Sequence, residues 1–215
     1  MTDKISMMKR GIGKEEIFNS VTHAIGLILA TAGLIFLIAE GRDSNSIALI
    51  IYGVTLVLLY LASTLYHLTT HEKTKSIFRI LDHIGILLLI AGTYTPFCVI
   101  ALKGPAGTIL LALVWLLALL GLILKIFFTG KYDVLSVLLY LAMGWLVIMV
   151  LRPVYLALPG VSFIFLIIGG VSYSSGVLFY RMINLRYHHG IWHIFVLGGS
   201  ISHFISILNL LNYNL

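Results

Sequence analysis

The sequence predicts an all-α, polytopic membrane protein built as a bundle of seven transmembrane helices. Of its 215 residues, 60% are hydrophobic and only 10% are charged, against about 45–50% and about 25% in ordinary soluble domains. The mean hydropathy is +1.07, and several apolar stretches exceed the roughly 18 residues that mark a spanning helix. These observations exclude a soluble protein with a water-facing surface, and with it a Rossmann-type enzyme.

Seven apolar segments, each near the length that crosses about 30 Å of hydrocarbon, account for almost the whole chain. In chain order they are Ile17–Ala39, Ser46–Leu68, Ile80–Leu102, Thr108–Phe128, Val134–Leu151, Gly160–Tyr180 and His189–Leu211. Polar or helix-breaking residues, such as Arg152-Pro153, separate them. We therefore expect one domain over residues 1–215, of which residues 1–15 form a short basic tail. Pro96 predicts a kink near the outer end of the third segment.

The distribution of Lys and Arg predicts the orientation in the membrane. Eleven of these residues lie in the N-terminal tail and in or near alternate loops: Lys4, Lys9, Arg10, Lys14, Lys73, Lys75, Arg79, Lys125, Lys131, Arg181 and Arg186. The opposite side has only Arg42, Lys103 and Arg152. The positive-inside rule then places the N-terminus in the cytoplasm and the C-terminus outside. The formal charge of +6 thus indicates orientation in a cell membrane, and we expect no nucleic-acid partner.

This arrangement excludes two well-known classes of seven-helix protein. A retinal protein needs a lysine in its last helix for the Schiff base, yet the last lysine of this chain is Lys131. A receptor coupled to G proteins has its N-terminus outside, the reverse of the prediction here. The single cysteine, Cys98, cannot supply a Cys-rich zinc site, so a metal would need histidine and carboxylate ligands.

Four polar residues lie at the predicted cytoplasmic ends of three spans: His67, Asp82, His189 and His193. Ionisable groups are costly in a bilayer and therefore indicate a functional site. His189 and His193 are one helical turn apart on one face, a spacing with which two imidazoles can bind one zinc ion. His67 is the best candidate for a third ligand. Three histidines with an open fourth position are typical of catalytic rather than structural zinc.

Other polar residues near this depth allow two interpretations each. Ser63, one turn before the predicted ligand on its helix, either belongs to the site or bonds back to its own helix. Asp82 either activates water or caps the third helix. Glu16, Asn19 and His23 form one polar stripe on the first helix, which either orients the metal ligands or packs helices together.

Two features of the last two spans predict packing. His203 lies about 21 Å further along its helix than His189, too far to join the same metal. It suits a polar pocket or a helix contact. Small residues of the sixth span, Gly169, Gly170, Ser172, Ser175 and Gly176, favour close helix packing over lining a cavity.

Four motifs together resemble the bacterial hemolysin III-like proteins, which belong with the progestin and adipoQ receptor family and are related to the alkaline ceramidases. The motifs are Glu16-Ile-Phe-Asn19-Ser-Val-Thr-His23, Ser63-Thr-Leu-Tyr-His67, Leu81-Asp82-His83-Ile84-Gly85 and His188-His189-Gly-Ile-Trp-His193. The resemblance implies seven helices with the N-terminus inside. It also implies zinc held by His67, His189 and His193, with Asp82 and Ser63 near the water on the zinc.

The resulting hypothesis is a zinc-dependent hydrolase of a lipid amide or ester bond. Zinc lowers the pKa of its water from 15.7 to about 7; Asp82 would accept or orient the water proton, and Ser63 would hydrogen-bond the water or the developing oxyanion. A membrane lipid is the expected partner, as substrate or as ligand. The alternatives are a non-enzymatic membrane-homeostasis factor or lipid sensor with a structural zinc and, least supported, a cytolytic pore, which would need a continuous water-lined polar face.

Overall fold

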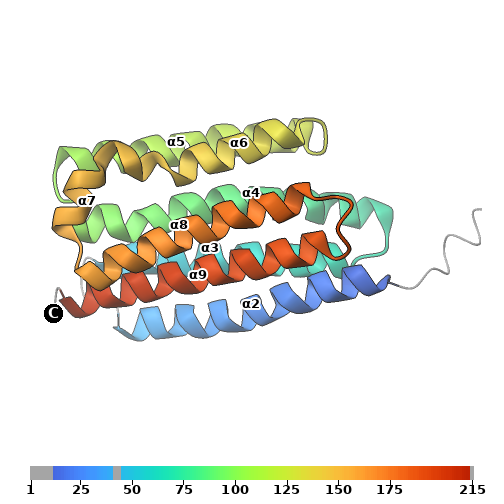
Figure 1. Ribbon diagram of the computed structural model, residues 1–215, viewed down its shortest axis with the longest axis horizontal. Helices are drawn as coiled ribbons and strands as arrows, with labels where there is room; N and C mark the ends of the chain where they lie inside the picture. The colour runs from blue at the N-terminus through green and yellow to red at the C-terminus, as the bar shows by residue number, and fades with distance from the viewer. Residues whose placement is uncertain (1–11, 41–44, 214–215) are drawn as a thin grey trace, which may run out of the picture.

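The computed structural model describes residues 12–40 and 45–213, which fold into a bundle of long helices (Figure 1). The helices are α2 (Lys14–Glu40), α3 (Ser46–Leu68), α4 (Glu72–Pro96), α5 (Pro105–Phe128), α6 (Asp133–Gly144), α7 (Leu151–Ala157), α8 (Gly160–Arg181) and α9 (His188–Tyr213). Two short elements interrupt the third and fifth spans, the π-helix η2 (Phe97–Ala101) and the 3₁₀ helix η3 (Leu146–Val150). Seven segments of this part of the chain are long and apolar enough to cross a membrane, which confirms the predicted class. Lys4, Lys9 and Arg10 of the predicted tail lie outside the described residues.

The helices run back and forth, so that one end of the bundle collects the start of α2 and the loops after α3, α5 and α8 (Figure 1). We call this the N-terminal end. α2 packs against α3 and α9, α3 against α4, α4 against α5, and α8 against α9. α5 and α6 form the layer farthest from α2 (Figure 1). Every predicted site residue lies in the half of its helix nearest the N-terminal end.

The third span begins at Glu72, about two turns before the expected start at Ile80. The added turns contain charged residues that are good helix formers, so the helix continues beyond its apolar part. At its other end, the backbone changes to the π-helix η2 directly after Pro96. A proline inside a helix removes one backbone hydrogen bond, and the hydrogen-bond pattern changes here, while the predicted kink stays a prediction.

The fifth span does not end at Arg152-Pro153 as expected; it breaks earlier, after Gly144, and continues through η3 and α7. Pro153 lies in the first turn of α7, where a missing backbone N–H costs no helical bond. A tyrosine from α4 satisfies the broken backbone: the Tyr94 hydroxyl donates to the Gly144 carbonyl and accepts from the Val147 amide, both at 2.9 Å. The break is thus a supported feature of the fold.

The close contact between α8 and α9 confirms the packing prediction for Gly169 and Gly176, where a Cβ atom would collide with side chains of α9, whereas Gly170 lines a cavity instead. His203 of α9 lies directly against Gly169 of α8, where a side chain would collide with the imidazole. The same histidine donates from Nε2 to the Leu166 carbonyl at 3.1 Å. Ser162 and Ser206 each donate to the other's carbonyl, at 2.8 and 2.6 Å. His203 therefore serves a helix contact, as expected from its depth.

Candidate metal centre

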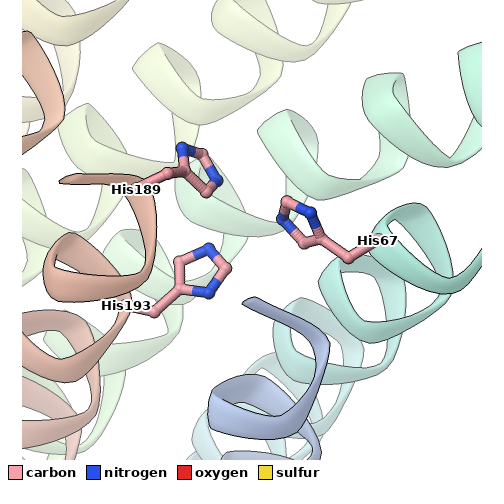
Figure 2. Close-up of side chains that lie close together, drawn as sticks. All are labelled: His67, His189 and His193. Atoms are coloured by element: carbon pink, nitrogen blue, oxygen red, sulfur yellow. The ribbon is translucent and has the colours of Figure 1, made fainter. Parts of the chain in front are cut away.

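Three histidines from two helices meet near the N-terminal end of the bundle (Figure 2). His67 lies in the last turn of α3, whereas His189 and His193 lie in the first two turns of α9. One ring nitrogen from each histidine lies within 4.8 Å of those of the other two. His67 and His193 are buried and His189 is half-buried. Figure 2 shows the three rings turned toward one shared point.

The ring nitrogens that point into this cluster are available as ligands. His67 donates from Nδ1 to the Glu16 carboxylate at 2.5 Å, and His193 donates from Nδ1 to the Asn19 carbonyl at 3.1 Å. In a neutral imidazole that donates from Nδ1, the other nitrogen carries the lone pair that binds metals. The Nε2 atoms of all three histidines are buried and lack a hydrogen-bond partner among the described residues. The donor set fits a divalent cation that prefers imidazole ligands.

Residues of the first helix hold two of these rings in place. Glu16 also accepts a hydrogen bond from the Lys75 ammonium group at 2.6 Å, so one carboxylate joins His67 to α4. Asn19 contacts His193 through its backbone carbonyl. Thr22, which was not among the predicted site residues, lies on the same helix with its hydroxyl oxygen 3.1 Å from His193 Nδ1. Thr22 follows Asn19 by three residues and therefore lies on nearly the same face of the helix, which is the sequence pattern that could have identified it.

His23, the last member of the polar stripe, packs flat against a member of the histidine cluster. Its ring centroid lies 3.5 Å from that of His193, with 17° between the planes, and Tyr60 meets it edge-on at 5.1 Å. Both His23 ring nitrogens are buried and have no hydrogen-bond partner in the described part of the chain. His23 therefore supports the His193 ring by stacking and stands outside the group of three.

Ser63 and Asp82 lie beside the cluster, on α3 and α4. Ser63 is fully buried, and its hydroxyl makes no bond back to its own helix among the described residues. Asp82 is 5% exposed and interacts electrostatically with His67. Because α4 begins ten residues earlier, at Glu72, Asp82 is too far along the helix to cap it. The two capping and back-bonding alternatives are therefore wrong, and both groups remain available beside the cluster.

A cavity of about 380 Å³ opens next to these residues. Asp82 and His189 line it near the N-terminal end, and Thr93 and His203 line its deep end. Its walls come from α4, α6, α8 and α9 and are mostly apolar. Sites of this volume accommodate small organic ligands. The polar cluster therefore faces an elongated apolar space inside the bundle.

Comparison with known proteins places the chain in a family. A family model described as "Haemolysin-III related" matches residues 13–204. The chain is 48% identical over 199 residues to the Hemolysin-3 homolog of Bacillus subtilis (strain 168), covering 91% of this chain and 93% of that protein. Identity is also 48% over 212 residues to Hemolysin-3 of Bacillus cereus, covering 97% and 96%.

A more distant relative is the human Monocyte to macrophage differentiation factor, 28% identical over 200 residues that cover 90% of this chain and 83% of that protein. The first helix, the histidine cluster and the residues beside it all lie inside the matched range. This agrees with the resemblance seen in the sequence motifs. The chain belongs to the haemolysin-III related family and is a multi-pass membrane protein.

Proposed function

We propose that this protein is a zinc-dependent hydrolase that cleaves an amide or ester bond of a membrane lipid. The observation that carries the proposal is the position of three unpartnered histidine Nε2 atoms beside Asp82, at the polar end of an apolar cavity. The predicted orientation puts this end of the bundle at the cytoplasmic leaflet.

His67, His189 and His193 would hold the zinc and leave a fourth position open, as in catalytic sites. Bound there, zinc polarises a carbonyl and lowers the pKa of water from 15.7 to about 7. Glu16 and the Asn19 carbonyl keep the rings of His67 and His193 oriented, a role that carboxylates and carbonyls commonly perform behind metal ligands.

The groups beside the histidines carry the proton transfer. Asp82 accepts the proton of the attacking water, for which its buried and unpartnered Oδ1 is available, and returns it to the amine or alcohol that leaves when the C–N or C–O bond breaks. Ser63 donates a hydrogen bond to the developing oxyanion, a contribution of about 3–4 kcal/mol to the barrier in comparable sites. The cavity holds an acyl chain and thereby keeps the carbonyl next to these groups. A lipid sensor in which zinc only joined α3 to α9 would need neither group.

The first test is the metal content of the purified protein, measured by mass spectrometry in detergent. We expect about one zinc per chain in the wild type and its loss in His67→Ala, His189→Ala and His193→Ala, because each removes a ligand. The matched control is His71→Ala, which removes an exposed histidine. Folded wild-type protein that holds no metal under any zinc concentration would contradict the proposal.

The second test is fatty-acid release from lipids with an amide-linked or an ester-linked acyl chain. Asp82→Asn should retain zinc and lose most of the release, since an amide cannot accept the water proton. Chelation should abolish release in the wild type, and added zinc should restore it. Full metal occupancy without release from either class of lipid would favour the sensor interpretation.

A further inference from the structure

A second cluster of charged side chains lies at the same end of the bundle, away from the three histidines. It consists of Arg79 on α4, Lys125 on α5 and Asp133 on α6. Arg79 and Asp133 line the mouth of the cavity, and Lys125 lies behind them against Tyr140, which also lines the cavity. Lys125 is close enough to both other residues to interact with them electrostatically.

The two cations in this cluster have no direct anionic partner. Among the described residues, every ion pair within 4 Å involves Glu16, so neither Arg79 nor Lys125 has a carboxylate at that distance. Lys125 is only 5% exposed, and its ammonium group lies 5.8 Å from the centre of the Tyr140 ring. A buried cation without a paired anion is costly. Within the cluster there is one carboxylate for two cations, and the next carboxylate, Asp82, lies one turn further along α4.

The chain around the cluster is shaped to hold Arg79 in place. The turn between α5 and α6 passes through Gly130 at φ +82°, a conformation that favours glycine. A Cβ atom at this position would lie only 3.1 Å from Arg79 Nη1, so the turn packs directly on the guanidinium group. Asp133 Oδ1 is buried and has no hydrogen-bond partner in the described ranges. Arg79 and Asp133 thus line a part of the cavity that is polar and incompletely paired, with Lys125 behind them.

We propose that Arg79 and Lys125 form an anion-binding site for the headgroup of an amphiphile whose hydrocarbon chain occupies the cavity. The inference names the substrate class of the proposed hydrolase and rests on that proposal. Arg79 lies three residues before Asp82, about 4.5 Å along the axis of α4. The headgroup charge therefore lies one turn outside the reacting groups, and the cleaved bond lies within a few atoms of it.

The shape of the cavity favours an amphiphile over a free inorganic anion. On α4 its lining runs from Arg79 to Tyr94, and on α9 from His188 to His203. The two ends of each run are 15 positions apart, which corresponds to about 22 Å along a helix. An inorganic anion gains nothing from this apolar length, whereas an alkyl chain buries its surface there.

Two tryptophans, Trp145 and Trp192, line the cavity and provide the readout. The probe is 12-bromododecyl phosphate, whose bromine quenches tryptophan fluorescence, added to the protein in phosphatidylcholine nanodiscs. The neutral counterpart is 12-bromododecanol. We expect saturable quenching by the phosphate with an affinity at least tenfold higher than that of the alcohol. Equal affinities of the two probes would overturn the proposal.

Substitutions of Arg79 and Lys125 test whether the phosphate probe binds at these two cations. Arg79→Gln and Lys125→Gln should each weaken the phosphate probe about tenfold, the usual effect of losing a charge-assisted hydrogen bond. Arg79→Lys keeps the charge and should recover most of the affinity. The control is Lys131→Gln, which removes an exposed cation from the same turn and should change nothing. Wild-type affinity in both Gln variants would overturn the assignment.

Two further experiments distinguish binding at this cluster from binding of a free anion and from binding at the histidine cluster. Inorganic phosphate should fail to displace the probe. If it displaces the probe with an affinity equal to that of the probe, the site binds free anions, which would contradict the proposal of an amphiphilic ligand. Removing metal with a chelator should leave probe affinity unchanged, and its loss would show that the phosphate binds the histidine cluster instead. Since zinc content and fatty-acid release are measured separately, failure of the anion site and failure of the hydrolase are distinguishable.

Discussion

The histidines of this protein differ in chemistry because their neighbours differ. His67 and His193 each donate from Nδ1 to an acceptor on α2, which leaves Nε2 of each ring facing the cluster. His203 instead donates from Nε2 to a carbonyl of α8; its Nδ1 is buried without a hydrogen-bond partner among the described residues, but the ring stands outside the group of three. His23 stacks on His193. Free ring nitrogens are therefore not confined to the cluster, and the place of each ring in the bundle decides which of them can bind one metal together.

The Glu16 carboxylate should strengthen metal binding although it does not reach the metal. Glu16→Gln keeps the size of the side chain but removes the charge next to His67 Nδ1. We expect metal affinity to fall 10–100-fold, the usual cost of losing such a partner. Competition with a chromogenic chelator measures the change. Glu40→Gln, an exposed position at the other end of α2, is the control, and equal affinity in both variants would contradict this role.

At the scale of the element, the interrupted fifth span shows how irregular backbone persists within a membrane bundle. Backbone groups in a bilayer must be satisfied internally. The Tyr94 hydroxyl serves the last carbonyl of α6 and an amide of η3 together. Trp145, between α6 and η3, donates to Ser174 of α8 at 3.0 Å. The break in the span thus joins α6 to α4 and α8 along the cavity wall.

Removal of this hydroxyl should destabilise the fold. Tyr94→Phe leaves the Gly144 carbonyl and the Val147 amide without their partner in apolar surroundings. The expected cost is about 1–3 kcal/mol, seen as a lower Tm in detergent. Tyr155→Phe, at a position that is 63% exposed, is the control and should unfold at the wild-type temperature. A Tyr94→Phe variant as stable as this control would show that other groups satisfy the break.

The molecule as a whole exposes large apolar side chains and buries polar ones beside an apolar core. Large exposed side chains such as Ile28, Phe127 and Met149 face outward, whereas Asn19, His67 and Asp82 are buried. This is the distribution expected where lipid, rather than water, surrounds the helices. The interior polar groups then lie where only a molecule inside the bundle can reach them.

The orientation of the bundle remains a prediction of the positive-inside rule, and thiol labelling tests it. In a Cys98→Ala background, a cysteine at Lys103 should react with a membrane-impermeant reagent added to intact cells. A cysteine at Lys131 should react only after the membrane is opened. Both positions are exposed and lie at opposite ends of the bundle. The reverse pattern would place the histidine cluster at the outer face.

Helix ends and breaks were the part of the fold that the sequence predicted least well. α4 begins at Glu72 rather than near Ile80, and the fifth span breaks after Gly144 rather than at Pro153. Hydropathy reports which residues can lie in lipid, and a helix can continue past that limit. The break near Gly144 depends on the Tyr94 hydroxyl from another helix, which no local pattern reveals.

The sequence by itself determined the seven spans, and the spacing of His189 and His193 on one face, because helix length and helical period are local properties. Only the tertiary structure decided that His67 meets this pair, that Glu16, Asn19 and Thr22 hold the rings, and that Asp82 cannot be a cap. It also placed Arg79 and Asp133 at the cavity, with Lys125 behind them against Tyr140. These contacts join residues far apart in the chain, so they depend on how the helices pack.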